Sequence, residues 1–262
     1  QFDRCDASPE VNAMGLDDVC LGVVGLNLPR AACATGSEEL FYSELDRLMD
    51  IAAKAHYAKR EFITRLLNVK AFGPLAFLAT GHDGRQLFDL EQAYHGIGVS
   101  GLNECVCILT GNQMHEDPDA LALGLRICHH IAHGCSRMSE REGFPIRPTP
   151  SPPETASLRF PILDARIYSE KLRNVIKAQP VTQDLYYTEG VSCADDAQLI
   201  PFERIRLEAP FHEIMPGVAN TRISIPDGVG AEGVADLIAK TSRHTVCRSL
   251  ECIPRTGGRP LW

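Results

Sequence analysis

The sequence has no surplus of basic residues: 26 Lys and Arg stand against 34 Asp and Glu, which gives a formal net charge of −8. Grooves that bind nucleic acids neutralise phosphates with clustered Lys and Arg, and no basic run occurs here. No apolar run approaches the ~20 residues that a membrane span needs, and QFDRCDASPE at the N-terminus has no signal-peptide core. We expect a cytoplasmic protein that binds neither nucleic acid nor membrane.

Cysteine is plentiful, yet no two of the ten cysteines have Cys-x-x-C spacing. Cys247 and Cys252 stand five apart and amount at most to half of a zinc site, so we expect no closed structural metal site. In a cytoplasmic chain of this length, cysteines are more often reduced core residues than a disulfide framework. One or two of them could still carry redox chemistry.

The length and a 44% share of hydrophobic residues are typical of a globular enzyme with its own core. LGVVGLNLP at 21–29 predicts a buried strand, and the capping-box spacing of Thr35 and Glu38 predicts a helix reaching about Leu67. Asp117 as cap predicts a second long helix that ends near Gly143. A last helix is expected from Gly233 to about Ser242.

Short strand-like pieces follow the proline-rich loop at 147–153: LRFPIL, DLYYTEGV, IRLEAPFHEIM and NTRISIP. Strands and long helices mixed in this way indicate an α/β barrel or a layered sheet rather than a helical bundle. We find no internal repeat and no clear domain linker.

Gly96, Gly98 and Gly101 in HGIGVSGLNECV spell the G-x-G-x-x-G of dinucleotide-binding proteins. That motif needs a preceding strand, a following helix of several turns and an acidic residue about 20 residues on. The flanking residues do not supply this context, so a tight backbone turn is favoured, with Asn103 capping a short helix and Glu104 favoured by the helix dipole.

His129, His130 and His133 have the helical spacing of metal ligands, but they project with charged residues, so we favour a solvated face. RPTPSPPETASLRF is the most unusual stretch. Ser151, Thr155 and Ser157, with the backbone N–H groups of a rigid loop, could hold an anion. Composition alone favours a rigid connector instead.

Several segments, taken in order, resemble the catalytic domain of anaerobic (class III) ribonucleoside-triphosphate reductases, which are glycyl radical enzymes. The likeness covers roughly residues 18–245 and is carried by LGVVGLNLPR at 21–30, GIGVSGLNECVCILTG at 96–111, HEDPDALALGLRI at 115–127 and SPPETASLRF at 151–160, followed by YYTEGV and IRLEAPFHEIMPG.

The resemblance implies a ten-stranded α/β barrel with helices outside, forming a homodimer that binds ribonucleoside triphosphates. In such enzymes a cysteine thiyl takes the 3′ hydrogen of the ribose, the 2′ hydroxyl leaves as water, and formate or a thiol supplies electrons. A radical-SAM activating enzyme, a glycyl radical and zinc are expected for the full-length protein.

The resemblance also implies roles for named residues. Cys5 becomes the candidate thiyl carrier and Cys20 a substrate-side or redox residue, with small buried thiols as the alternative. The SPPETAS stretch matches the loop that binds the substrate phosphates in the family. The resemblance therefore favours a phosphate site there over a rigid connector. Substrate-binding candidates are Asn103, Glu104, Ser151, Glu154, Thr155 and Ala156.

Some family parts are missing: the effector region, the four-cysteine zinc module and the terminal glycine, of which Arg255-Thr256-Gly257-Gly258 is a superficial echo. We expect residues 1–245 to be the C-terminal part of the catalytic barrel, and 246–262 to be a divergent tail outside the ordered core, truncated or out of frame. Such a fragment would be inactive alone. The alternatives are a glycyl radical enzyme of the formate-lyase type and an inactive nucleotide-binding remnant.

Overall fold

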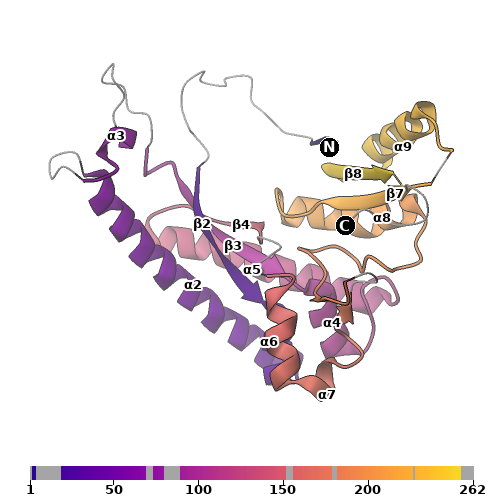
Figure 1. Cartoon of the computed structure of the whole chain (residues 1–262), viewed down its shortest axis with the longest axis horizontal. Coiled ribbons are helices and arrows are strands. Elements are labelled where there is room, and N and C mark those ends of the chain that lie inside the picture. Colours follow the sequence, from indigo (N-terminus) through magenta and orange to yellow (C-terminus); the bar gives the residue numbers. More distant parts are fainter. Residues whose placement is uncertain are drawn as a thin grey trace.

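The computed structural model describes residues 2–3, 19–68, 73–79, 89–151, 156–178, 182–226 and 228–254. Cys5, Glu154, Thr155 and the Arg255–Gly258 stretch lie outside these residues. The described part is α/β, as predicted, with long helices packed beside small sheets (Figure 1).

Three parallel strands form the first sheet, in the order β2 (Cys20–Asn27), β3 (Tyr94–Ser100), β4 (Ile146–Pro150). In this register Asn27 lies opposite Ser100, and Val99 lies opposite Pro150. The carboxyl ends of the three strands therefore meet at one edge of the sheet. The predicted strand at 21–29 is confirmed except at its end, where Leu28 and Pro29 already belong to the next helix.

Two long helices cover one face of this sheet: α2 (Glu38–Leu67) and α5 (Pro118–Glu142). For α5 both predicted ends are confirmed, since Asp117 caps the N-terminus and Gly143 follows the C-terminus in the left-handed conformation. The predicted start of α2 is wrong by two residues. Ser37, not Thr35, accepts the capping bond, from the Leu40 N–H, because Thr35 ends the preceding helix.

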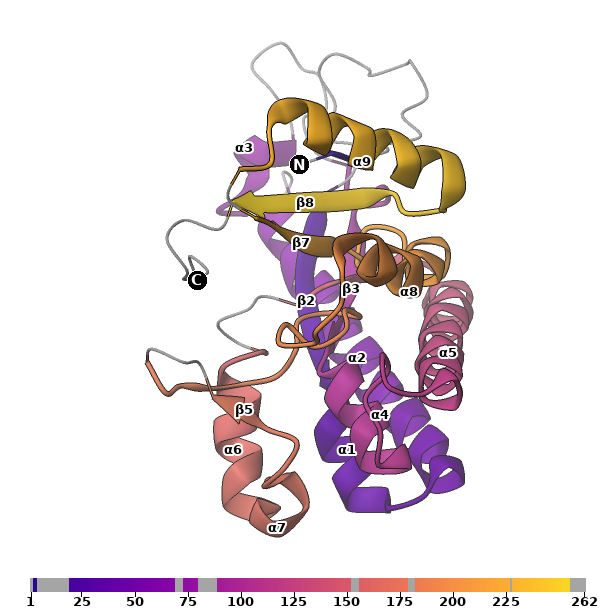
Figure 2. The ribbon, with the colours of Figure 1, turned by 90° about the vertical axis from the view of Figure 1, so that its right-hand side faces the viewer.

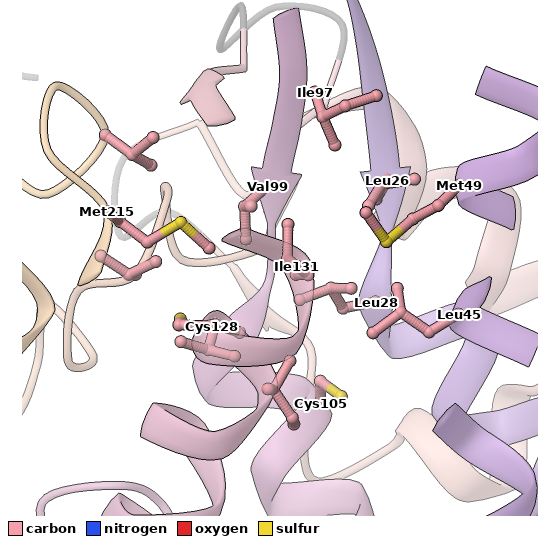
Figure 3. Close-up of a cluster of buried hydrophobic side chains, with 14 of the residues drawn as sticks. Leu26, Leu28, Leu45, Met49, Ile97, Val99, Cys105, Cys128, Ile131 and Met215 are labelled. Carbon is pink, nitrogen blue, oxygen red and sulfur yellow. The ribbon is translucent and has the colours of Figure 1, made fainter. Parts of the chain in front are cut away.

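The main core lies between this sheet and the helices (Figure 3). Leu26 and Val99 from the strands meet Leu45 of α2 and Ile131 of α5, and Cys105 and Cys128 are buried among them. All nine described cysteines are free thiols, six of them buried. The prediction of reduced core cysteines is confirmed for those six.

Short helices follow two of the strands directly: α1 (Leu28–Thr35) after β2, and α4 (Leu102–Thr110) after β3. The remaining small elements are α3 (Ala76–Ala79), α7 (Ser169–Leu172), β5 (Lys177–Ala178) and β6 (Leu185–Tyr186).

The second sheet contains β7 (Thr221–Ile225) and β8 (Ser249–Pro254) in parallel, with β1 (Phe2–Asp3) antiparallel at the side of β8. Helices α8 (Pro201–Ile214) and α9 (Ala231–His244) flank the strand pair (Figure 2). Cys247 and Leu250 are buried with Ile205 and Ile223 in a second small core. Residues 249–254 of the expected tail form β8, which pairs with β7.

Two stretches predicted as strands are helices. LRFPIL belongs largely to α6 (Arg159–Ile167), and IRLEAPFHEIM lies mostly in α8. In α8 the apolar residues alternate over a short stretch as they would in a strand. Three buried polar residues, Arg204, Glu208 and His212, recur every four positions, which is the helical repeat. NTRISIP and the last helix are confirmed as β7 and α9.

The described strands form two three-stranded sheets and one two-stranded sheet, so a closed ten-stranded barrel is not seen within them. Among the described helices, none combines the length and apolar character that crossing a bilayer requires.

Candidate active site

The glycines of the G-x-G-x-x-G motif serve strand packing and a turn. A Cβ on Gly96 would lie 2.2 Å from Thr149 Cγ2, and one on Gly98 would lie 2.3 Å from Ser151 Oγ. Both glycines lie inside β3, where they let Thr149 of β4 and Ser151 just after it lie close to the backbone. Gly101, with φ of 73°, makes the turn that begins α4, as predicted.

Asn103 does not cap α4, because that position belongs to Gly101, one residue before the helix. The Asn103 side chain is buried; its Oδ1 accepts the backbone N–H of Met114 at 3.2 Å, and its Nδ2 donates to Gln113 at 3.2 Å. It ties α4 to the segment that leads into α5, so the capping prediction is wrong.

Glu104 lies in the first turn of α4, as predicted, but it is fully buried rather than exposed to a solvent-filled site. Its Oε1 accepts the backbone N–H of Thr188 at 3.0 Å and the Thr188 hydroxyl at 2.6 Å. Burial raises the pKa of this carboxyl, against the lowering effect of the Thr188 bonds. Glu104 therefore holds residues 188–190 beside the carboxyl end of β3.

Three serines lie at or beyond the ends of the strands: Ser100 is the last residue of β3, Ser151 follows β4, and Ser157 precedes α6. All three are buried, and their hydroxyl oxygens have no hydrogen-bond partner among the described residues. Buried polar groups are normally paired, so these hydroxyls are candidates for contacts to a ligand. In parallel sheets, ligands bind at the carboxyl ends of the strands. We call these three groups the carboxyl-end hydroxyls.

A pocket of about 470 Å³ opens beside Ser151, within the size range of ligand pockets. Its other walls come from residues 189–195, from α8, from the turn at 216–220 and from the β7–β8 pair, whose strands cross the direction of β2 and β3 (Figure 2). The charged and polar lining includes Arg204, Arg222, Arg248, His212, Glu189 and Asp195.

The wall formed by α8 is pinned by a buried ion pair. Arg204 Nη1 lies 3.1 Å from Glu208 Oε1, and the same oxygen accepts the Cys193 N–H at 2.9 Å. Arg204 also donates to the carbonyls of Cys193 and Ala194. Burial raises the pKa of Glu208 to about 7, although Arg204 and the Cys193 N–H favour the charged form. The pair fixes residues 193–194, next to the pocket wall.

One turn further along α8, His212 links the helix to the second sheet. Its Nδ1 accepts the Ser249 N–H at 3.4 Å, and its Nε2 lies 3.0 Å from Thr221 Oγ1 and 3.6 Å from Cys247 Sγ. Burial lowers the pKa of His212 to about 4 and raises the pKa of Cys247. Both groups are therefore neutral at neutral pH, and the pair does not form a reactive thiolate.

Cys20 lies away from the carboxyl-end hydroxyls. It pairs with Tyr94 at the amino end of the sheet, whereas Asn27 and Ser100 are at the other end. Asn27 is seven positions along the strand from Cys20, a distance of roughly 23 Å. Ser151 and Ala156, by contrast, are both buried on either side of the loop expected to bind phosphate. The structure thus brings Ser151, Ala156 and Glu104 to one end of the sheet and places Cys20 at the opposite end.

The histidines of α5 lie as the solvated-face prediction requires. His129 and His133 are exposed, and His130 Nε2 lies 2.8 Å from Asp46 of α2. The described residues contain no group of three or more His, Cys, Asp or Glu side chains placed to bind a metal ion.

Sequence reasoning missed the polar residues that organise the site from a distance, namely Asp164, Arg204, Glu208 and Arg222. The four-residue spacing of Arg204 and Glu208 was the one available signal, since it suits an ion pair on a helix. Asp164 and Arg222 find their partners more than 20 positions away, which no local pattern reveals.

Comparison with known proteins gives a consistent result. The family model for anaerobic ribonucleoside-triphosphate reductase matches residues 4–252. Similar curated proteins are the anaerobic ribonucleoside-triphosphate reductases of Haemophilus influenzae (27% identical, 75% of this chain and 28% of the relative), Escherichia coli (28% identical, 75% and 28%) and Enterobacteria phage T4 (27% identical, 79% and 33%). The chain spans a third or less of the length of these relatives.

Similar solved structures include the anaerobic ribonucleotide reductase from Thermotoga maritima with glycerol in the active site, with a TM-score of 0.70 at 18% identity over 88% of this chain and 35% of that chain. The same reductase in complex with dATP and CTP gives a TM-score of 0.68 at 19% identity, over 88% of this chain and 36% of that chain. At such identities the likeness shows the fold.

Proposed function

Because the chain belongs to the anaerobic ribonucleoside-triphosphate reductase family, we propose that it is a segment of the catalytic domain of an oxidoreductase of this kind. The reaction reduces ribonucleoside triphosphates to 2′-deoxyribonucleotides. The main support within the structure is the Ser151 hydroxyl, which is buried without a partner among the described residues and lines an arginine-bearing pocket. Unpaired buried hydroxyls and a guanidinium-lined wall suit a phosphorylated sugar.

The phosphates would lie at the carboxyl ends of the strands, near Ser151 and the loop that reaches Ala156, where Glu154 and Thr155 would supply further contacts. Asn103 and Glu104 would shape the site indirectly, through the bonds they make to neighbouring segments. A nucleotide with its phosphates there could meet Cys20 only if its other end reached toward the amino end of β2.

The radical step is proposed from the family alone. Cys5 would carry the thiyl that takes the 3′ hydrogen, and formate or a thiol would supply the electrons. The described residues offer no set of three metal ligands and do not fit the family's zinc site, so we derive no step through zinc or through the glycyl radical. A radical-SAM activating enzyme would act on the full-length protein.

Residues 1–245 would form part of a ten-stranded barrel. In the described sheet, β2 and β4 are the outer strands, and each has one edge where a further strand could pair. Relatives of this kind make homodimer formation our expectation, and the composition makes the cytoplasm the expected location.

Two other functions remain as alternatives to test. A formate-lyase type of glycyl radical enzyme would need paired adjacent cysteines, and Cys5 has no cysteine neighbour. An inactive nucleotide-binding remnant would keep the pocket and bind nucleotide without turnover. Titration calorimetry with CTP, combined with an assay for deoxycytidine nucleotide on the full-length protein treated with its radical-SAM activating enzyme, separates the remnant from the reductase.

Ser151→Ala tests the proposed phosphate end. We expect CTP affinity to fall about 10- to 100-fold, because a hydrogen bond to a charged oxygen contributes about 1.5–3 kcal/mol. The free energy of unfolding should change by less than about 0.5 kcal/mol, since the Ser151 hydroxyl has no protein partner to lose among the described residues. Calorimetry and urea denaturation measure the two quantities.

Ser136→Ala, on the exposed face of α5, is the matched control and should leave CTP affinity unchanged. Equal CTP affinity for Ser151→Ala and the wild-type chain would contradict a phosphate site at this end of the sheet.

A further inference from the structure

We propose that the outer face of helix α2 is a docking surface for a second copy of this chain, with the two α2 helices antiparallel and Ile51 at the two-fold axis. The inference concerns the surface of α2 alone and does not rest on the proposed function. None of the residues that it uses lines the pocket.

Three large apolar side chains lie exposed along α2: Leu40, Ile51 and Phe62 keep 57%, 48% and 56% of their surfaces exposed. They are eleven positions apart, and eleven residues at about 100° each return a helix to within roughly 20° of the same direction. The three side chains therefore form one stripe, roughly 33 Å from end to end, which we call the outer stripe. Leu45 and Met49, which lie between them in sequence, point to the core instead.

The outer stripe faces away from the rest of the described chain. Figure 1 shows α2 along one edge of the molecule, with β2 and α5 on its inner side. Single exposed apolar side chains are ordinary, but a continuous line of them is typical of a surface that binds another protein. The exposed fractions show that no described segment covers this line, so its partner comes from outside the described residues.

The spacing of the outer stripe suits a partner with the same sequence. Ile51 lies at its midpoint, eleven positions after Leu40 and eleven before Phe62. In an antiparallel pair with Ile51 on the two-fold axis, Ile51 meets itself, and Leu40 of each copy meets Phe62 of the other. A closed two-fold interface requires a patch that is complementary to itself in this way.

Between these apolar contacts, the same register sets large residues against small ones. Arg47 of one copy meets Ala55 of the other, and Glu44 meets Ala58. Arg47 and Glu44 already pair with each other at 2.7 Å within one helix, so neither charge is left uncompensated against an alanine. Large side chains opposite small ones let two helices approach closely and interdigitate.

The charges along α2 favour the antiparallel direction. Residues 38–50 hold five acids and one base, whereas residues 52–65 hold four bases and one acid. Antiparallel pairing therefore sets the acidic half of each helix against the basic half of the other, and parallel pairing would set like halves together. Three of these acids also pair with basic residues of α5, and their side chains stay about half exposed. Lys54 has no ion pair among the described residues and would lie near Asp50 of the second copy.

Sedimentation equilibrium of the chain tests the surface. We expect a monomer–dimer equilibrium with a dissociation constant on the order of 10–100 µM, because one helix pair buries less area than a standard interface. Ile51→Lys puts two ammonium groups against each other at the two-fold axis and should weaken the dimer by about tenfold or more. Tyr57→Lys is the matched control. Tyr57 is also 48% exposed on α2 but points about 120° away from Ile51, so the dimer should persist.

Cysteine cross-linking tests the direction of the pair. Chains with Leu40→Cys and chains with Phe62→Cys, distinguished by a size tag, should form a disulfide with each other when mixed and air-oxidised, because the two positions face each other. Neither variant should cross-link with itself, since its two introduced cysteines would lie roughly 33 Å apart. The wild-type chain under the same conditions gives the background from the native cysteines.

Urea denaturation at about 1 µM, where the chain is monomeric, should give the same midpoint for Ile51→Lys and the wild-type chain, because Ile51 is not part of the core. Loss of the dimer would then not be loss of the fold. A wild-type chain that stays monomeric up to about 500 µM, or a dimer that Ile51→Lys leaves intact, would overturn the proposal and leave the proposed function standing. Self-cross-linking of Leu40→Cys above background, without the mixed product, would overturn the antiparallel register.

Discussion

Replacing Arg204 by alanine is expected to lower the free energy of unfolding by about 3–5 kcal/mol, because the change leaves a buried carboxylate without its cation. Glu208 is 3% exposed, and Arg204 is its charged partner in α8. The substitution also removes the donors to the carbonyls of Cys193 and Ala194. Urea denaturation measures the loss as a lower midpoint at constant m-value.

The loss should depend on pH in a defined direction. The pKa of Glu208 is already raised to about 7 with Arg204 present, so the folded state holds a proton that the unfolded state releases above about pH 4.5. Stability linked to this group is therefore lost as pH rises toward 7. Without Arg204 the folded pKa is higher still, and the loss continues to higher pH. The difference between variant and wild type should be larger at pH 8 than at pH 6.

Arg126→Ala provides the matched control, since Arg126 pairs with Glu38 at 2.9 Å while both side chains are about half exposed. Exposed pairs contribute about 0.2–1 kcal/mol, so a small loss without strong pH dependence is expected. A double variant, Arg204→Met with Glu208→Leu, should recover much of the stability, because it removes both charges together. Equal losses for Arg204→Ala and Arg126→Ala would show that the buried pair is not what holds α8.

The sequence predicts best those elements whose signals are local. Helix α5 begins at Asp117 and ends before Gly143 because capping and left-handed turns depend on a few neighbouring residues. The short helix after Gly101 and the strand at β2 follow from equally local patterns.

Helix α8 shows why other elements are misread. Its buried face carries Arg204, Glu208 and His212 instead of apolar residues, so hydrophobic periodicity does not reveal a helix. Pro210 inside the stretch also suggests a break. Only the partners in the 193–194 segment and in β7 and β8 show that these polar residues face inward.

Some residues of the candidate site can be predicted from the sequence, and others cannot. Ser151 and Ala156 are found from the loop composition and the family resemblance, and the structure buries both of them. The bonds that Asp164 accepts from Asn27 and Arg30 are out of reach of sequence patterns, because the two donors precede it by 137 and 134 positions. The position of Cys20 at the far end of β2 depends on strand register, which the sequence leaves open.

Acid should destabilise the fold through three buried histidines, His56, His95 and His212, and His95→Phe is expected to remove a large part of this effect. Burial lowers the pKa of His95 to about 4, with His56, Arg60 and Lys59 adding to the lowering, and burial lowers that of His212 to about 4 as well. Each must stay neutral in the fold but takes a proton near pH 6.5 when unfolded. Stability is therefore complete above pH 6.5 and is lost as pH falls toward 4, by about 3 kcal/mol for His95 and the same for His212.

His95 is the better residue to replace because its ring makes no hydrogen bond among the described residues. Both ring nitrogens are buried without a partner, and the ring packs between His56 and Phe144 at centroid distances of 4.8 Å. Phenylalanine has a similar shape and no polar group to desolvate, so stability at pH 7.5 should be unchanged or higher. Between pH 6 and pH 4.5, the slope of unfolding free energy against pH should fall by nearly one proton, or about 1.4 kcal/mol per pH unit.

Urea denaturation at a series of pH values measures this slope for the variant and the wild-type chain. Glu208 contributes with the opposite sign between pH 4.5 and 7, but it is present in both proteins and cancels in the comparison. The control is His129→Gln, at an exposed position of α5, which should leave the slope unchanged. Phenylalanine is avoided at this position because it would expose an apolar ring. Identical slopes for His95→Phe and the wild-type chain would mean that His95 takes up its proton equally in the folded and unfolded states. Both ring nitrogens of His95 already lack a partner among the described residues, so a proton taken up in the folded state would add a buried donor without an acceptor.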